Sequence, residues 1–185
     1  MTATEARLPI RWHPAIVALH WLTLLLIALQ YVLARLMGDE TRDLVGRFEL
    51  YQLHKSIGLT VAVFVLLRLA LRLVLPAPPP TRPEPWQRLA AGAVQGGLYL
   101  CLAALPLTGM LMVSAAPIQI PTLYFGWFAV PHLIGPDKAT YEMMLSLHER
   151  VFDLLIVFGL IHLGAVLFHR LVWGDGLLHR MWFRS

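Results

Sequence analysis

Two histidines in the last apolar run of the chain, residues 145–170, have the spacing of metal ligands. His148 and His162 are fourteen residues apart. On a helix this spacing returns to within about 40° of the same face and separates the two side chains by about 21 Å along the axis. Neutral imidazoles are common metal ligands. The spacing therefore predicts one helix that contributes a ligand to each of two separate metal centres.

The composition indicates which elements must position these histidines. Of the 185 residues, 58% are hydrophobic and only 14% are charged, whereas a soluble domain has about 25% charged residues. Because the apolar residues form long blocks, we expect an all-α integral membrane protein, a single domain of residues 1–185. Its four transmembrane helices should form an up-and-down bundle. The expected spans are about 14–37, 54–75, 89–113 and 145–173.

The connector between the third and fourth spans, residues 114–144, contains several prolines and a cluster of aromatic residues. Aromatic side chains favour the membrane interface, so we expect this connector to lie there and not to form a fifth span. The single cysteine, Cys101, excludes a disulfide framework, an iron–sulfur ligand set and a CxxCH haem-attachment motif within the chain.

The direction of each span predicts how the histidines pair. Lys and Arg are more frequent on the side that holds both termini and the 76–88 connector, so the positive-inside rule places both termini in the cytoplasm. The first span then leaves the cytoplasm, while the second and fourth return toward it. We therefore expect His54 to meet His148 near the outer surface. We expect His20 to meet His162 nearer the cytoplasm.

Two imidazoles on facing helices suit the iron of a bis-histidine haem. Zinc prefers four ligands close together, and the two expected pairs are about 20 Å apart. Gly58 lies four residues after His54, on the same helix face, and should leave room for the macrocycle. The alternative for each histidine is a polar residue that hydrogen-bonds across a helix interface. Other small residues that could make room are Gly97, Gly109, Gly159 and Gly164.

Charged side chains within the spans need a partner, because an isolated charge in hydrocarbon is costly. Arg68 lies fourteen residues after His54, so it should reach the depth of the inner haem and form an ion pair with a haem propionate. Arg72 is a second choice for this role, and Arg35 could serve the outer haem in the same way. The alternative is that these side chains extend to lipid headgroups.

Two further side chains, His169 and Trp21, are expected near His20 and His162. His169 lies seven residues after His162 and on the same helix face, so it is a rival ligand for the inner haem. We expect His162 to be the ligand, because His169 would lie close to the cytoplasmic surface. Trp21, next to His20, could contact the haem.

Four stretches carry a resemblance to a known family: ALHWLTLLLI (18–27), LHKSIG (53–58), LPLTGMLM (105–112) and HERVFDLLIVFGLIHLGAVLFH (148–169). They resemble the bacterial cytochrome b561 family of four-helix, inner-membrane dihaem proteins, which is related to the cytochrome b subunits of hydrogenases and formate dehydrogenases. The haem ligands of that family fall here on His20, His54, His148 and His162. The resemblance implies two b haems and electron exchange with ubiquinone.

These observations predict a multi-pass protein of the bacterial inner membrane that transfers electrons between an external donor and the ubiquinone pool. Some relatives in this family take the electron from superoxide, and Lys55 and Arg150 could attract that anion to the outer haem. Two alternatives remain: a cytochrome b anchor subunit for a soluble dehydrogenase, and a haem-free four-helix transporter. We expect no nucleic-acid partner.

Overall fold

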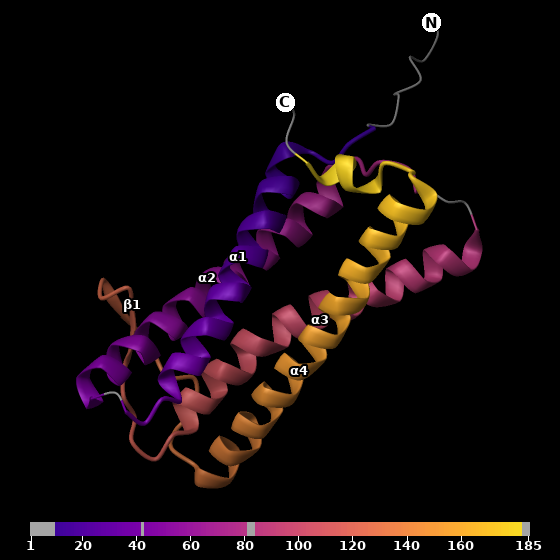
Figure 1. Ribbon diagram of the computed structural model, residues 1–185. Helices are drawn as coiled ribbons and strands as arrows, with labels where there is room; N and C mark the ends of the chain where they lie inside the picture. Colours follow the sequence, from indigo (N-terminus) through magenta and orange to yellow (C-terminus); the bar gives the residue numbers. More distant parts are fainter. Residues whose placement is uncertain (1–9, 42, 81–83, 183–185) are drawn as a thin grey trace, which may run out of the picture.

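In a computed structural model, which describes residues 10–41, 43–80 and 84–182, four helices are long and apolar enough to cross a membrane (Figure 1). They are α1 (Pro14–Met37), α2 (Leu44–Val74), α3 (Pro85–Ala115) and α4 (Lys138–Phe168). A π-helical turn, η1 (His169–Trp173), continues α4, and a 3₁₀ helix, η2 (Leu177–Met181), follows. This architecture confirms the expected all-α, four-span fold.

Three of the four helices begin earlier than the expected spans. The α2 helix begins at Leu44 and not at His54, because Asp43 accepts a hydrogen bond from the backbone N–H of Gly46 at 3.2 Å. The α4 helix begins at Lys138 and not at residue 145, because the side chain of Asp137 accepts a hydrogen bond from the backbone N–H of Thr140 at 2.7 Å. The hydropathy of the chain marks the apolar part of each helix, whereas the capping residues set where the helix starts.

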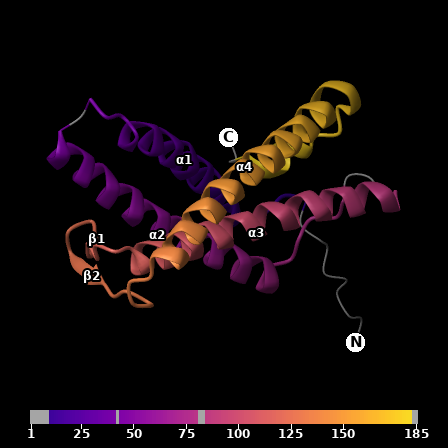
Figure 2. The ribbon, with the colours of Figure 1, turned by 90° about the horizontal axis from the view of Figure 1, so that it is seen from below.

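The helices pack in two antiparallel pairs. Helix α1 packs along α2 and α3 packs along α4, and contacts between α2 and α3 join the pairs. Figure 2 shows α1 running alongside α2 and α4 crossing α3. All four helices contribute to one buried apolar cluster, which consists of Leu33, Ile57, Val61, Val65, Cys101, Leu102 and Leu155. This cluster lies between the helices, and many outward-facing side chains are apolar, as in a membrane bundle.

The connector between α3 and α4 is shorter than expected and contains a β-hairpin. Strands β1 (Thr122–Tyr124) and β2 (Phe128–Val130) are antiparallel, with Leu123 opposite Ala129. The turn requires positive φ at Phe125 (47°) and Gly126 (78°); this conformation is easy only for the glycine. The expectation for 114–144, an interfacial connector and not a fifth span, did not include this hairpin, because strands of only three residues leave little pattern in the sequence.

The hairpin is attached to the polar face of α2. The side chain of Gln52 accepts a hydrogen bond from the N–H of Leu123 at 3.0 Å. One turn later, the hydroxyl oxygen of the buried Ser56 accepts from the N–H of Phe125 at 3.0 Å. Residues four apart lie on the same helix face, so these two side chains fix the hairpin to one side of α2.

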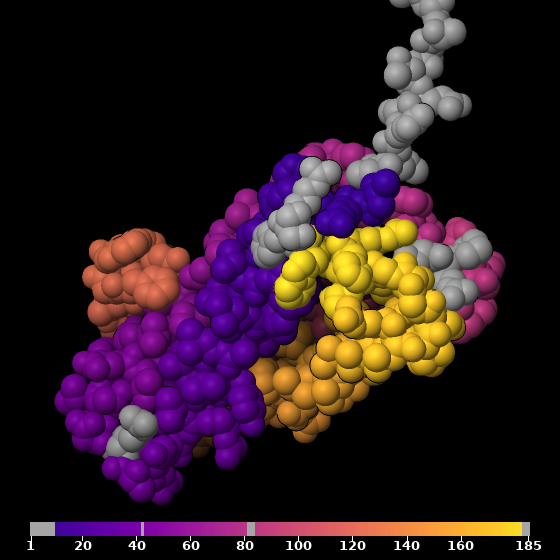
Figure 3. Space-filling view, turned by 45° about the horizontal axis from the view of Figure 1, so that its top comes forward, coloured from indigo at the N-terminus to yellow at the C-terminus, as the bar shows by residue number. Residues whose placement is uncertain are grey.

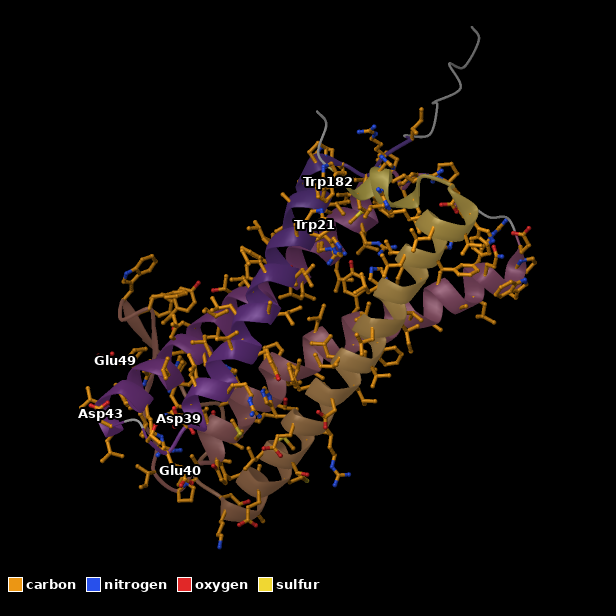
Figure 4. All side chains as sticks on the ribbon, viewed as in Figure 1. Trp21, Asp39, Glu40, Asp43, Glu49 and Trp182 are labelled. Carbon is orange, nitrogen blue, oxygen red and sulfur yellow. The ribbon has the colours of Figure 1, made fainter. Side chains whose placement is uncertain are left out.

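The N-terminal and C-terminal segments meet at one end of the bundle. The N–H of Trp12 donates to the carbonyl of Arg180 at 3.2 Å, and the indole N–H of Trp21 donates to the carbonyl of Met181 at 2.8 Å. Figure 3 shows the C-terminal segment beside the start of α1. Four acidic residues gather at the opposite end (Figure 4): Asp39, Glu40, Asp43 and Glu49.

Candidate metal centres

The first candidate centre lies between α2 and α4 and is formed by His54 and His148. Their ring centroids are 6.5 Å apart and their planes are inclined by 65°. Both side chains are half-buried. The Nδ1 atom of His54 is buried and makes no hydrogen bond within the described residues. The rings are therefore too far apart for a direct hydrogen bond, and each retains a nitrogen that can bind a metal.

The second candidate centre lies between α1 and α4 and is formed by His20 and His162. Their ring centroids are 6.3 Å apart and their planes are inclined by 72°. The ring of Trp21 packs edge-on against the ring of His20, with centroids 5.4 Å apart. Because its indole N–H is bonded to the carbonyl of Met181, Trp21 holds α1 against the C-terminal segment.

The separation of the rings in each pair fits one metal ion between two imidazoles. A metal–imidazole nitrogen bond is about 2.0–2.1 Å and the ring centroid lies about 1.1 Å behind that nitrogen, so two imidazoles on opposite sides of an ion have centroids about 6.3 Å apart. The observed distances are 6.3 and 6.5 Å. Within the described residues there is no cluster of three or more His, Cys, Asp or Glu side chains that could hold a metal ion. The arrangement fits bis-histidine haem and not a zinc site.

Thr108 on α3, which the sequence analysis did not single out, orients the imidazole of His148. Its hydroxyl oxygen lies 2.8 Å from the carbonyl of Ala104 and 3.1 Å from Nδ1 of His148. Because the hydroxyl has one proton and the carbonyl can only accept, we assign the proton between Thr108 and His148 to Nδ1. His148 then keeps a free lone pair on Nε2, the form that binds a metal. The available signal was a hydroxyl residue within an apolar span, two residues after Pro106.

A cavity of about 1170 Å³ adjoins the outer pair, and both histidines line it together with residues of all four helices. Gly58 and Gly109 are in its wall. A Cβ at Gly109 would lie 3.4 Å from Cε1 of His148, and a Cβ at Gly58 would lie 3.1 Å from Nε2 of Gln30. Gly58 thus borders the cavity, but its close neighbour is Gln30, which the sequence analysis did not single out. The Gln30 amide donates to the carbonyl of His54 at 3.0 Å.

Arg68 lies close enough to both His20 and His162 to interact with them electrostatically. Its guanidinium carbon is 5.5 Å from the centroid of the Tyr99 ring. His169, the rival ligand, is bonded through Nδ1 to a carboxylate oxygen of Asp175 at 2.5 Å. It also packs against Trp173, with centroids 4.5 Å apart. Arg68 is thus within electrostatic range of His20 and His162, whereas His169 is bonded to Asp175 in the C-terminal segment.

Of the cationic residues expected near His54 and His148, Lys55 lines the same cavity as the two histidines. The ammonium of Lys55 donates to the carbonyl of Pro121 at 3.3 Å, next to the hairpin. Arg150 is exposed on α4. Arg35 borders a small surface hollow together with Asp39. Of the other glycines, Gly97 packs closely on α4, whereas a Cβ at Gly159 or Gly164 would meet no atom within 4 Å.

Comparison with known proteins identifies the family of this chain. The sequence profile described as prokaryotic cytochrome b561 matches residues 11–184, which include all four histidines. Cytochrome b561 homolog 2 of Escherichia coli (strain K12) is 29% identical over 180 residues, covering 96% of this chain and 94% of that protein.

Two further relatives have a similar degree of identity. Cytochrome b561 homolog 1 of Escherichia coli (strain K12) is 28% identical over 164 residues, covering 88% of this chain and 92% of that protein. A protein of Yersinia pestis named probable superoxide oxidase CybB is 28% identical over 173 residues, covering 89% of this chain and 92% of that protein. Both relatives therefore match most of this chain and most of their own length.

Proposed function

The chain belongs to the prokaryotic cytochrome b561 family, and from this premise we propose that it binds two b haems and transfers electrons across the membrane between an external donor and ubiquinone. Membership implies b-type haem, membrane electron transfer and a bacterial membrane location. We assign one haem to His54 and His148 and the other to His20 and His162. When bound, such haems supply reversible one-electron chemistry at iron.

One observation carries the proposal: α4 presents a histidine to each of two facing histidines on other helices. The ring separations of 6.5 and 6.3 Å both match what one ion between two imidazoles requires. Since α4 is continuous from Lys138 to Phe168, the two centres are about 21 Å apart along it. Edge-to-edge distances between macrocycles would be shorter, which favours electron transfer from one side of the membrane to the other.

The residues of the chain restrict the chemistry to electron transfer. Two imidazoles per ion leave no open coordination position, so binding of oxygen or peroxide at iron is disfavoured. Thr108 holds the His148 ring in the tautomer that binds a metal.

We propose that both termini face the cytoplasm in the inner membrane, so that His54 and His148 are on the outer side. The name of the Yersinia pestis relative favours superoxide as the donor. The acidic residues at that end, Asp39, Glu40, Asp43 and Glu49, disfavour an anion. They favour the second candidate, an anchor and electron-transfer subunit that receives electrons from a soluble dehydrogenase with a basic surface.

The test is an optical spectrum of the purified full-length protein, reduced minus oxidised, with the ratio of haem to protein. We expect two low-spin b haems per chain. His54→Ala and His148→Ala should remove the same haem, and His20→Ala and His162→Ala should remove the other. His169→Ala is the matched control and should retain both haems, because His169 is bonded to Asp175.

A colourless protein would reject the haem assignment in favour of the haem-free transporter. If His169→Ala and His20→Ala removed the same haem, the assignment of His162 as the second ligand of that haem would be wrong. Reduction of ubiquinone by the isolated protein when superoxide is supplied would favour the self-contained oxidoreductase. Copurification with a dehydrogenase, without such activity, would favour the anchor subunit.

A further inference from the structure

A cationic cluster on the inner half of the bundle is built around Tyr99 of α3. Arg68 and Arg72 are four residues apart on α2 and therefore on the same face. Their guanidinium carbons lie 5.5 and 5.7 Å from the centroid of the Tyr99 ring. Arg72 also lies 5.1 Å from the ring of Trp12. Two cations thus share one aromatic ring inside a membrane bundle.

The hydrogen-bonding groups of this cluster lack suitable partners. The Nε atom of Arg68 and the hydroxyl of Tyr99 are buried and make no hydrogen bond within the described part of the chain. Arg72 makes only long contacts, 3.4 and 3.5 Å, with the side-chain oxygen of Gln95. Buried donors are almost always satisfied in proteins. The cluster therefore presents unused donors to a ligand.

The charge of the cluster is likewise unbalanced. Over residues 10–41, 43–80 and 84–182, no carboxylate forms an ion pair with Arg68 or Arg72. Asp175 is bonded to His169, and Glu84, the N-cap residue of α3, lies about 16 Å along the helix axis from Gln95. Partly desolvated cations in a membrane normally have an anionic partner. Among the described residues, an aromatic face and an amide are the groups that contact these two cations, so a carboxylate of a ligand is a suitable partner for them.

The position of the cluster indicates which kind of anion binds to it. The cluster lies at the end of the bundle that holds the pair His20 and His162, because Trp21, which packs against His20, donates a hydrogen bond to the carbonyl of Met181, next to Arg180. The Trp12 ring lies beside Arg72, and its backbone N–H is bonded to Arg180 in the C-terminal segment. These segments lie over this end of the bundle (Figure 3). A carboxylate on a group held between the two imidazoles approaches this cluster from within the bundle, whereas a lipid phosphate would have to pass the terminal segments.

We propose that Arg68, Arg72 and the Tyr99 hydroxyl together bind the two propionate carboxylates of the haem held by His20 and His162. This inference rests on the proposed function, because it requires that haem. It goes further in assigning both arginines and a tyrosine hydroxyl to one site. A guanidinium presents paired N–H donors that match a carboxylate. The phenol adds one donor, and its ring holds both guanidinium groups in place.

The proposed site changes the reduction potential of the haem held by His20 and His162. Negative propionates favour the oxidised iron, which carries more positive charge. Guanidinium groups and a hydroxyl donor offset that negative charge, so they raise the reduction potential of the haem. Tyr99 and the arginines are positioning residues, because they act on the propionates and not on the iron.

The test is an optical redox titration of full-length variants, in which the outer haem serves as an internal reference. Tyr99→Phe retains the ring and removes only the hydroxyl, and Arg72→Gln removes one charge. Each should lower the potential of the haem that His20→Ala removes, by about tenfold in equilibrium constant, which for a one-electron couple is about 59 mV. The other haem should not shift. Tyr31→Phe, on α1 and stacked on Phe152, is the matched control.

The outcomes separate this inference from the proposed function. A wild-type protein without haem would reject the proposed function, and this site with it. Two haems with an inner potential that neither Tyr99→Phe nor Arg72→Gln moves would overturn the propionate site alone. The same unmoved potential, combined with a loss of copurified phospholipid phosphorus in Arg72→Gln, would assign the cluster to a lipid headgroup instead.

Discussion

The hydroxyl oxygen of Thr108 lies 3.1 Å from Nδ1 of His148, although the two residues are forty positions apart on neighbouring helices. Thr108 is buried, and its proton is directed to the backbone of its own helix at Ala104. It therefore accepts the Nδ1 proton of His148 and holds the ring in one tautomer and one orientation. This contact makes α3 a contributor to the outer centre without providing a ligand.

We predict that Thr108→Val weakens haem binding at the outer centre. Valine keeps the shape of the side chain but removes the acceptor, and loss of such a partner typically costs about 10–100-fold in metal affinity. Haem titration of the apoprotein, with the inner haem as reference, measures the change. Thr108→Ser keeps the hydroxyl and should bind as the wild type does. Equal affinities for the valine and serine variants would contradict the role of the hydroxyl.

Gly97 permits α3 to lie close to α4. A Cβ at this position would lie 2.6–2.8 Å from ring atoms of Phe158, whereas a Cβ at the adjacent Gly96 would meet nothing within 4 Å. We predict that Gly97→Ala lowers the unfolding temperature in detergent by forcing the ring to move. Gly96→Ala should be neutral or slightly stabilising, since alanine favours a helix by about 1 kcal/mol over glycine. Similar effects of the two substitutions would argue against a close helix contact at Gly97.

Ser56 attaches the hairpin to α2. Its hydroxyl oxygen is bonded to the N–H of Phe125 at 3.0 Å and also lies 3.1 Å from the carbonyl of Leu123. We predict that Ser56→Ala costs about 1–3 kcal/mol, because buried backbone groups lose their partner. Limited proteolysis should then cleave between residues 116 and 137. Ser146→Ala, at an exposed position of α4, should leave the cleavage rate unchanged; faster cleavage there too would indicate a nonspecific effect.

The stability of the first turn of α4 depends on pH through the carboxyl group of Asp137. Hydrogen bonds from the side chain and backbone of Thr140 hold the pKa of the Asp137 carboxyl below its ordinary value. A lowered folded-state pKa means that the stabilisation is present above the unfolded value, about 3.9, and is lost as pH falls through the folded value. Unfolding temperatures should therefore decline below about pH 4. Asp137→Asn, which cannot titrate, should decline less; parallel curves would show that the cap does not contribute.

Much of the fold could be predicted from local properties of the chain. The four apolar runs define the spans, since crossing the bilayer requires about twenty apolar residues in a row. The sequence analysis placed the starts of the second and fourth spans at about residues 54 and 145. The helices begin earlier, at Leu44 and Lys138, because capping by Asp43 and Asp137 extends each helix beyond its apolar part. The hairpin was missed, because Gln52 and Ser56 stabilise it from another helix.

By itself, the sequence determined the separation of the two histidines on the fourth helix, because the rise per residue is a property of a single helix. His148 and His162 are separated by fourteen residues whatever surrounds them. Only the tertiary structure decided how each helix is rotated about its own axis. That rotation brings Thr108 to His148 and places Tyr99 beside Arg68 and Arg72. Contacts between helices depend on packing across the whole bundle, and no local spacing in the chain encodes them.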